Sequence, residues 1–368
     1  MRITAIKVLP VTIPRLKALK VAYTTRTVYQ GFLLQLGTDS GCTGLGEAAP
    51  NFEVCGEDLE GTAAALAAMA ARVRDGDPLE REALLARLEP WRRDHAAALT
   101  AFDTALWDLA GKAAGLPVRD LLGGFRRSLP NAMTIGILPL AETLAEARSI
   151  LASGRFAEMK LKLGLDPDLD VVRVRAVRAL AGPDYPLHVD ANQGYDAPTA
   201  LRVLTQLAAE RVDFAEQPVP ARDHEALKWV SDRSPVPVMA DEAVHTPEDA
   251  LDLVRARACA MLNIKLQKVG GISRALDALA VARSGGLPCL IGCMTETRVG
   301  ITAGAHLALA SPVVTHVDLD GHVDLAFTPV AGGIREEGDR LTVPDTPGLG
   351  VELTDEWRDR FNAVSPAT

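Results

Sequence analysis

The sequence predicts an α/β protein: a TIM-type barrel of alternating strands and helices, preceded by an α+β domain. The chief observation is that charged residues end short apolar runs at intervals close to the roughly 30 residues of one βα unit. These residues are Lys162, Asp190, Glu216, Asp241, Lys265 and Asp318, separated by 28, 26, 25, 24 and 53 residues, the last being about two intervals. The first 125 residues lack this rhythm, and a length of 368 residues favours more than one domain.

The first part of the chain, residues 1–125, has the pattern of an α+β domain. Alternating apolar and polar residues indicate antiparallel strands, and Ala- and Leu-rich stretches indicate helices. We expect strands at 3–13, 28–37 and 41–47, a turn at 38–41, and helices at 59–73 and 79–87.

The barrel itself is predicted from eight short apolar runs, often β-branched, that end near Gly, Pro, Asp or Asn. We expect parallel strands at 133–136, 159–163, 187–190, 212–216, 238–241, 262–265, 289–292 and 317–320. Helical stretches such as 169–180 and 250–259 lie between them, and Thr-Pro-Glu-Asp at 246–249 is a helix start signal. The barrel is assigned to residues 126–321, and we expect the tail, 322–368, to pack back on the first domain.

Composition excludes several classes of partner. The chain has 39 basic and 48 acidic residues, a net charge of −9, which disfavours nucleic acid and anionic membranes. The apolar stretch at 61–71 is too short to span a bilayer, and no secretory signal is expected. Five cysteines at unrelated spacings favour reduced thiols. We expect a cytoplasmic homo-oligomer that acts on a small molecule.

Three carboxylates form a candidate metal site. Asp190, Glu216 and Asp241 end successive predicted strands, so they converge at the C-terminal mouth of the barrel, where they repel unless a cation lies among them. Hard oxygen ligands suit one Mg²⁺ per subunit, with Mn²⁺ as a substitute. The alternative is that each residue only caps the next helix. It is disfavoured because three consecutive strands show the same pattern.

Lysines on the same strands supply the candidate chemistry. Lys160 and Lys162 are two residues apart and share the interior face, while Lys265 comes from the opposite side of the ring. Two lysines flanking a metal-bound carboxylate can remove the proton α to it and return one to the other face. Mg²⁺ and Lys160 would hold the enediolate, and positive charge with desolvation would lower the lysine pKa values. A buried ion network is the less favoured alternative.

The motifs at these strand ends resemble those of the enolase superfamily, in its muconate-lactonizing subgroup. They are Lys-Leu-Lys at 160–162, Asp-Ala-Asn-Gln at 190–193, Glu-Gln-Pro at 216–218, Ala-Asp-Glu at 240–242 and Asn-Ile-Lys-Leu-Gln-Lys-Val-Gly-Gly at 263–271. The resemblance covers nearly the whole chain, with further matches at 44–48, 102–108 and 347–350.

The resemblance implies a modified (β/α)7β barrel, closed by a capping domain that residues 1–125 and 322–368 build together. It places Asp190, Glu216 and Asp241 on Mg²⁺ and makes Lys162 and Lys265 the acid/base pair, with Lys160 beside them. Lys265 stands where enzymes of the mandelate-racemase type have a histidine, so that type is disfavoured.

One motif narrows the subgroup. Asp318-Leu319-Asp320 is similar to the Asp-x-Asp of dipeptide epimerases, as are 292–298 and 300–306. Two carboxylates on one strand face suit the α-ammonium group of a substrate, although a helix-capping role is the alternative. The expected substrate contacts also include Thr134. The resemblance implies an isomerase, similar to L-Ala-D/L-Glu epimerases, that inverts the C-terminal residue of an L,L-dipeptide by 1,1-proton transfer.

Specificity is left open by the sequence. In the resembling enzymes the loops at 21–29 and 50–57 contact the second side chain, and the Ala-Glu enzymes carry an Arg in the first loop. An ungapped comparison places Thr24 there, with Arg26 two residues later. Either Arg26 takes the role or another dipeptide is preferred, and Phe52 and Glu53 would suit apolar or cationic side chains.

Other activities use the same residues. An N-acylamino acid racemase, an o-succinylbenzoate synthase or a muconate cycloisomerase would share the lysines and the metal, but their substrates lack the ammonium group that an acidic pair would hold. A Schiff-base aldolase would use a lysine covalently and without metal. A barrel that only binds a metabolite is disfavoured because every catalytic group is present.

Overall fold

A ring of eight parallel strands forms the centre of the molecule in the computed structural model, which describes residues 1–366. The first strand, β5, lies beside the last, β12, so the ring is nearly closed and the predicted barrel is confirmed. The strands are β5 (Ala132–Ile135), β6 (Glu158–Lys162), β7 (Leu187–Asp190), β8 (Ala215–Glu216), β9 (Val238–Ala240), β10 (Met261–Lys265), β11 (Cys289–Gly292) and β12 (Val314–Asp318).

The last strand is placed differently from the prediction. It was expected at 317–320, but β12 begins at Val314 and ends at Asp318. Its partner β11 sets these limits, because the pairing runs from Cys289 opposite Val314 to Gly292 opposite Asp318 and stops where β11 stops. Asp320 therefore lies beyond the strand, and the expectation that Asp318 and Asp320 share a strand face is wrong.

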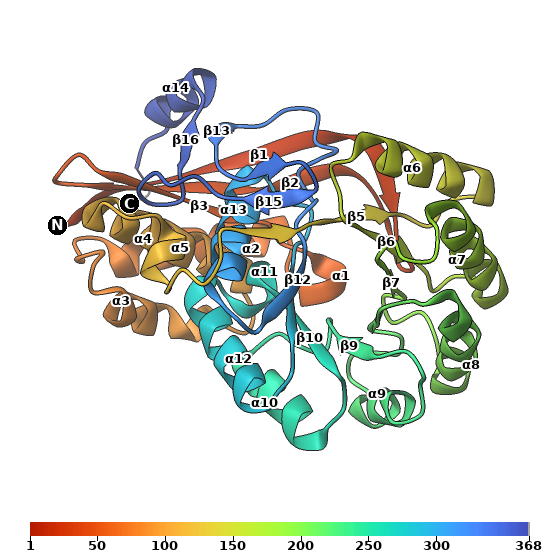
Figure 1. Ribbon diagram of the computed structural model, residues 1–368. Helices are drawn as coiled ribbons and strands as arrows, with labels where there is room; N and C mark the ends of the chain where they lie inside the picture. The colour runs from red at the N-terminus through yellow and green to blue at the C-terminus, as the bar shows by residue number, and fades with distance from the viewer. Residues whose placement is uncertain (367–368) are drawn as a thin grey trace.

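Helices surround the ring on its outer side (Figure 1). Thr246 accepts from the Asp249 backbone N–H in a capping box, which confirms the predicted helix start at that point. The helices are α6 (Leu140–Ser153), α7 (Pro167–Ala181), α8 (Ala197–Leu207), a 3₁₀ turn η2 (Ala208–Glu210), α9 (His224–Ser231), α10 (Pro247–Ala256), α11 (Leu266–Val269), α12 (Ile272–Ser284) and α13 (Arg298–Ala310).

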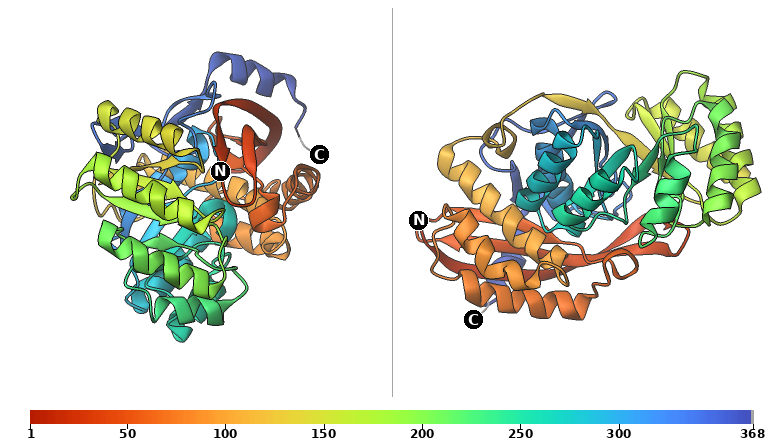
Figure 2. Two further views of the ribbon diagram at one scale, coloured as in Figure 1. Left: turned by 90° about the vertical axis from the view of Figure 1, so that its right-hand side faces the viewer. Right: turned by 90° about the horizontal axis from the view of Figure 1, so that it is seen from below.

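The N-terminal part is an antiparallel sheet covered by helices. Its first hairpin is longer than predicted and reaches along the barrel (Figure 2), where the Lys20 carbonyl accepts from Ile137 N–H at 2.8 Å. The elements are β1 (Ile3–Lys20), β2 (Thr25–Thr38), β3 (Thr43–Ala48), α1 (Phe52–Cys55), α2 (Leu59–Val73), α3 (Arg81–Leu88), η1 (Glu89–Trp91), α4 (Ala96–Ala114) and α5 (Val118–Leu121).

Both ends of the chain lie against each other. Lys7 Nζ on β1 donates to the Phe361 carbonyl of the last helix at 2.8 Å, and Leu349 N–H donates to Asp108 Oδ1 of α4 at 2.8 Å. A small sheet joins the tail to the segment before the barrel. That sheet contains β4 (Ser128–Pro130), β14 (Arg335–Glu337) and β15 (Arg340–Thr342). The other elements of the tail are β13 (Val330–Gly332), β16 (Val351–Leu353) and α14 (Asp355–Ala363).

The inside of the barrel is divided into an apolar and a charged part. Phe214, Met239, Met261 and Leu290 form a small buried cluster, and His188 stacks on Phe214 with ring centroids 4.4 Å apart. Asp190, Glu216 and Lys265 end their strands, so the candidate chemistry lies at the C-terminal end of the barrel. Among the described residues, no helix has the length and apolar character to cross a membrane.

Candidate active site

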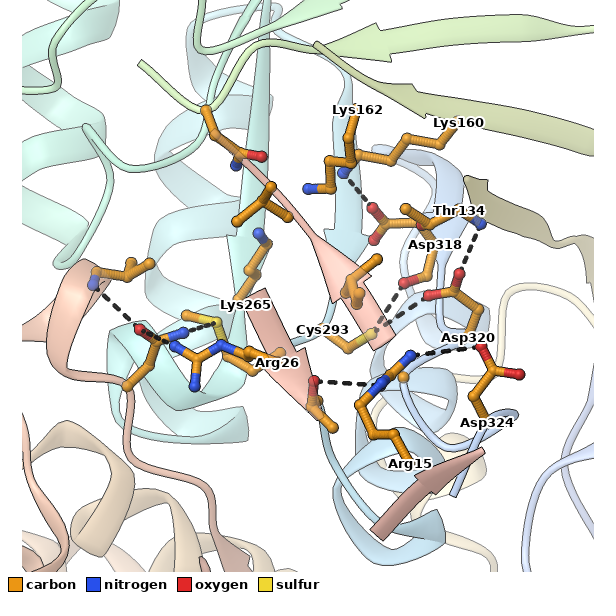
Figure 3. Close-up of a pocket in the computed structure, with 18 of the residues that line it drawn as sticks. Arg15, Arg26, Thr134, Lys160, Lys162, Lys265, Cys293, Asp318, Asp320 and Asp324 are labelled. Atoms are coloured by element: carbon orange, nitrogen blue, oxygen red, sulfur yellow. Dashed lines mark hydrogen bonds and ion pairs between the residues drawn. The ribbon is translucent and has the colours of Figure 1, made fainter. Parts of the chain in front are cut away.

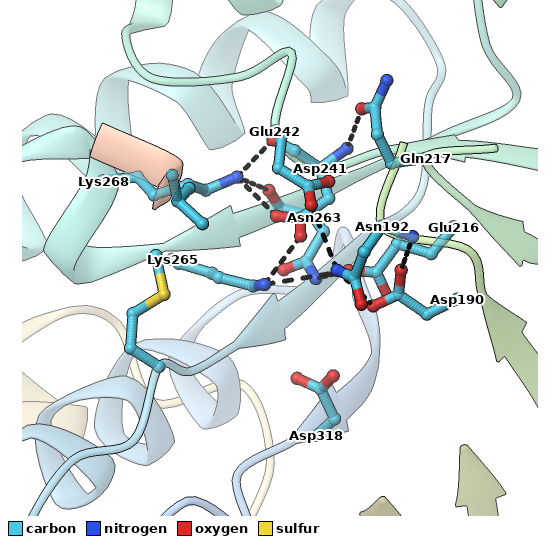
Figure 4. A network of polar contacts seen from close by, with 12 residues as sticks. Asp190, Asn192, Glu216, Gln217, Asp241, Glu242, Asn263, Lys265, Lys268 and Asp318 are labelled. Carbon is cyan, nitrogen blue, oxygen red and sulfur yellow. Dashed lines mark hydrogen bonds and ion pairs between the residues drawn. The ribbon is translucent and has the colours of Figure 1, made fainter. Parts of the chain in front are cut away.

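Three buried carboxylates meet at the mouth of the barrel. Asp190, Glu216 and Asp241 can each offer an oxygen within 4.8 Å of the others (Figure 4). None caps a helix, because the caps of the helices after β7, β8 and β9 are other residues, namely Asp196, Asp223 and Thr246. The helix-capping alternative therefore does not describe this triad.

The predicted lysines surround the triad. Lys160 Nζ lies 2.5 Å from Glu216 Oε2 and 2.5 Å from Asp318 Oδ2. Lys162 Nζ contacts Asp190 Oδ2 at 2.6 Å, and Lys265 Nζ contacts Asp241 Oδ2 at 2.7 Å. Lys162 and Lys265 come from strands on different parts of the ring, and both line the same cavity.

Lys268 belongs to this cluster and was given no role from the sequence. Its side chain is fully buried on α11, and its Nζ lies 2.5 Å from Asp241 Oδ1. Asp241 thus has one lysine on each oxygen. The sequence contains a weak signal, because a lysine three residues after Lys265 returns toward the strand end when one helical turn follows the strand.

Amides hold the carboxylates in place. Asn263 Nδ2 donates to Glu216 Oε1 at 2.7 Å, and Asn192 N–H donates to Asp190 Oδ1 at 2.8 Å. Gln217 Oε1 accepts from the backbone N–H of Asp241 at 2.9 Å and so holds its main chain, while Lys265 and Lys268 contact its carboxylate. These contacts fix the orientation of each carboxylate before any ligand arrives.

The pKa values of neighbouring carboxyl groups in the triad are shifted in opposite directions. Burial and Asp190 raise the pKa of Glu216 well above its ordinary value. Burial also acts against ionised Asp241, but Lys265 and Lys268 outweigh it and hold the pKa of Asp241 well below its ordinary value. One carboxyl group is thus driven toward the neutral form while its neighbour stays charged, as expected when carboxylates are forced together.

Two of the predicted lysines, Lys160 and Lys265, have raised pKa values, whereas the sequence predicted lowered ones. Burial does favour the neutral amines, but Asp318 and Glu216 raise the pKa of Lys160 well above its ordinary value. Asp241 and Glu216 do the same to the pKa of Lys265. The prediction counted burial and neighbouring positive charge and left out the stronger effect of the carboxylates.

The donor set fits a divalent cation. Carboxyl groups and lysines are gathered here, and Asp190, Glu216 and Asp241 can bring oxygens within 4.8 Å of one another, so a divalent cation among them would offset their mutual repulsion. The ligand atoms are hard oxygens, the type that Mg²⁺ and Mn²⁺ prefer. The residues are Asp190, Glu216, Asp241, Glu242, Asp318 and Asp320 with Lys160, Lys162, Lys265 and Lys268.

The expected ammonium-binding residues lie at one end of the cavity. Asp318 is buried, and its Oδ1 has no hydrogen-bond partner among the described residues. Asp320 Oδ2 accepts from the backbone N–H of Thr134 at 2.7 Å, so Thr134 contributes through its main chain as well as by lining the cavity. Within the described chain no helix begins between β12 and β13, which leaves the capping alternative without a helix to cap.

Arg26 lies at another part of the cavity wall. Its Nη2 contacts Glu53 Oε2 at 2.6 Å and Asn51 Oδ1 at 3.0 Å. Thr24 faces a different surface hollow, which Phe52 and Glu53 also line. Of the two residues considered for the side-chain-reading position, the fold therefore brings Arg26 to the cavity.

The cavity between the hairpin tip and the barrel mouth encloses about 770 Å³, including its open entrance. Figure 3 shows the lysines, the Asp318 to Asp324 segment and two arginines facing it. Apolar side chains complete the wall, so charged groups are concentrated at a few defined points. These apolar residues are Leu19, Val21, Val54, Met133 and Met294.

Two family models match the chain. Residues 3–123 match the N-terminal domain of the mandelate racemase/muconate lactonizing enzymes, and residues 142–357 match the enolase C-terminal domain-like family. Together the two matches span most of the sequence. The first covers the N-terminal domain with its long hairpin, and the second covers most of the barrel.

Characterised relatives align over almost their full length. The chain is 37% identical to the L-Ala-D/L-Glu epimerase of Clostridium acetobutylicum, covering 93% of this chain and 96% of that protein. It is 36% identical to the L-Lys-D/L-Arg epimerase of Methylococcus capsulatus, covering 96% of this chain and 100% of that protein.

Solved structures of related epimerases superpose closely on this chain. A substrate-liganded L-Ala-D/L-Glu epimerase from Bacillus subtilis superposes with a TM-score of 0.93 at 32% identity, covering 95% of this chain and 99% of that one. A dipeptide epimerase from Enterococcus faecalis, complexed with Mg and L-Leu-L-Tyr, also gives a TM-score of 0.93, at 33% identity and with coverage of 96% and 100%.

Proposed function

We propose that this chain, which belongs to the mandelate racemase/muconate lactonizing enzyme family of the enolase superfamily, is a Mg²⁺-dependent dipeptide epimerase. It is an isomerase that inverts the α-carbon of the C-terminal residue of an L,L-dipeptide. The observation that carries the proposal is the pair Lys162 and Lys265, which line one cavity from separate strands beside a carboxylate triad.

The two lysines perform the proton transfer. One neutral amine removes the α-proton, and the ammonium group of the other returns a proton to the opposite face, so the configuration inverts. Lys160, buried beside the triad, stabilises the negative charge that develops on the substrate carboxylate in the enediolate. Asp190, Glu216 and Asp241 would hold a divalent cation, which would supply positive charge at that carboxylate.

The dipeptide is recognised by its free amino terminus. Asp318 Oδ1 has no partner among the described residues, and Asp320 lies next to it in the cavity wall. An α-ammonium group that contacts both carboxylates would direct the following peptide bond toward the lysines and leave the C-terminal carboxylate for the triad. Arg26 would then lie near the side chain of the C-terminal residue.

The racemisation of N-acylated amino acids is the second candidate, because it would use the same lysines and the same triad. The chain is 29% identical to an N-succinyl-L-Arg/Lys racemase of Bacillus cereus. Asp318 and Asp320 favour the dipeptide, since an acylated amino group carries no positive charge for them. We further propose that Mn²⁺ substitutes for Mg²⁺ and that the enzyme is a cytoplasmic homo-oligomer.

The test is incubation with Mg²⁺ in D₂O against a panel of L,L-dipeptides, followed by mass spectrometry and chiral analysis. We expect a gain of one deuterium together with inversion at the C-terminal residue. The best C-terminal side chain in the panel shows whether Arg26 selects an acidic group. Exchange of N-acylamino acids without exchange of any dipeptide would favour the racemase instead.

A further inference from the structure

A second arginine, Arg15, faces the cavity at the end that holds Asp318 and Asp320 (Figure 3). We propose that Arg15 and Asp324 form the subsite for the side chain of the N-terminal residue, and that this subsite selects a neutral carboxamide, as in glutamine or asparagine. The inference rests on the proposed dipeptide activity, because it takes the ammonium site at Asp318 and Asp320 as its starting point.

The main chain fixes the place of Arg15. Its strand crosses the segment after β12, where Leu16 N–H donates to the Asp324 carbonyl at 2.7 Å and Ala326 N–H donates to the Pro14 carbonyl at 2.9 Å. The Arg15 side chain is only 6% exposed and that of Asp324 only 18%. Both side chains are therefore held at the cavity wall by the contact between the first strand and the barrel.

The two terminal nitrogens of the Arg15 guanidinium are weakly engaged, whereas its Nε donates to the Lys17 carbonyl at 3.1 Å. Its Nη1 lies 3.4 Å from Thr295 Oγ1 and its Nη2 lies 3.4 Å from Asp324 Oδ2, both longer than the roughly 2.7 to 3.2 Å of a good N–H···O bond. By contrast, Arg26 contacts Glu53 at 2.6 Å. A buried guanidinium with long bonds retains donor capacity for a ligand.

The position suits the first residue of a dipeptide. Along the cavity wall Asp318, Asp320 and Asp324 follow one another, and Arg15 contacts the last of them (Figure 3). An ammonium group at Asp318 and Asp320 puts the α-carbon of the N-terminal residue beside them. Its side chain then extends toward Arg15 and Asp324, away from the lysines that carry out the chemistry.

The charges favour a neutral group in this subsite. Lys160 balances Asp318 at 2.5 Å and Arg15 balances Asp324, which leaves Asp320 to balance the substrate ammonium. An acidic side chain would add negative charge near two carboxylates, and a basic one would meet Arg15. A carboxamide accepts from Arg15 through its oxygen and donates to Asp324 through its nitrogen, so it matches both partners.

The test compares dipeptides that share one C-terminal residue and differ in the N-terminal one: glutamine, glutamate, lysine and methionine, the last being close to glutamine in shape. We expect kcat/KM for the glutamine substrate to exceed that for the methionine substrate by about ten-fold, from one hydrogen bond to a charged group. Arg15→Met should remove this preference. Asp324→Asn should shift the ratio of glutamine to glutamate toward glutamate by about ten-fold.

Ratios within one protein are unaffected by the fraction of the variant that folds. Arg202→Met provides the matched control, because Arg202 pairs with Asp168 on the exposed surface and should leave every ratio unchanged. Wild-type ratios near one, or ratios that neither variant alters, overturn the inference while the dipeptide activity stands. No exchange with any dipeptide overturns the proposed function and this inference with it.

Discussion

His306 should give the protein a defined sensitivity to acid. It is buried on α13, where its Nδ1 accepts from the Arg119 backbone N–H at 2.9 Å. Nδ1 is therefore unprotonated, and Nε2 carries the hydrogen that is donated to the Leu349 carbonyl at 3.1 Å. The neutral ring joins the barrel to α5 and to the C-terminal tail, and protonation would break the first of these bonds.

The magnitude follows from the pKa. Burial lowers the pKa of His306 from 6.5 to about 4. Below pH 6.5 His306 binds a proton in the unfolded chain but not in the folded protein, so the free energy of unfolding falls as the pH falls toward 4. At 1.36 kcal/mol per pKa unit, the contribution of this residue is about 3 kcal/mol.

The assay is urea unfolding followed by circular dichroism at pH 7, 6, 5 and 4, comparing the wild type with His306→Gln. The variant should be less stable at pH 7, by about 1 kcal/mol for each bond that it fails to replace. Its free energy of unfolding should then fall less steeply, so the wild type loses about 3 kcal/mol more than the variant by pH 4, and the two curves should cross. Parallel curves would refute the reasoning.

Three further predictions concern the metal, the cluster and the fold. EDTA should abolish activity and added Mg²⁺ restore it, whereas borohydride with substrate should trap no covalent adduct; activity that survives EDTA would favour an aldolase-type site. Lys268→Met should lower the free energy of unfolding in EDTA by about 3 kcal/mol, because Asp241 loses a buried partner; an unchanged urea midpoint would contradict this. Thr246→Ala should cost about 1 kcal/mol of stability through loss of the capping box and leave kcat/KM unchanged.

The barrel could be predicted because its signal is local and repeated. Each strand is a short apolar run that ends in a charged residue, and the spacing follows from the length of one crossover. The shift of β12 was not predictable in this way, because its limits depend on where β11 ends and so on a pairing partner 25 residues away.

The candidate site was predictable where strand ends place residues. Asp190, Glu216, Asp241, Lys162 and Lys265 each follow from their position in a βα unit. Arg15 carried no such signal. Its place in the cavity wall arises from the crossing of β1 over the segment around Asp324, two parts of the chain 309 residues apart.

The electrostatics were the least predictable part. Residue types alone suggested lowered lysine pKa values, but the direction depends on which carboxylate oxygens lie closest to each amine. Lys265 has Asp241 at 2.7 Å, and this single contact acts against the effect of burial. Sequence spacing brought the groups together but gave no distances between them.

The central claim is that two lysines act on opposite faces of one α-carbon, and single-lysine variants test it most directly. Lys162→Ala and Lys265→Ala should each abolish epimerisation, since inversion needs both. In D₂O each variant should still exchange the α-proton of one substrate isomer slowly, and the two variants should act on opposite isomers. Full epimerisation by both variants, or exchange of the same isomer by both, would contradict the account.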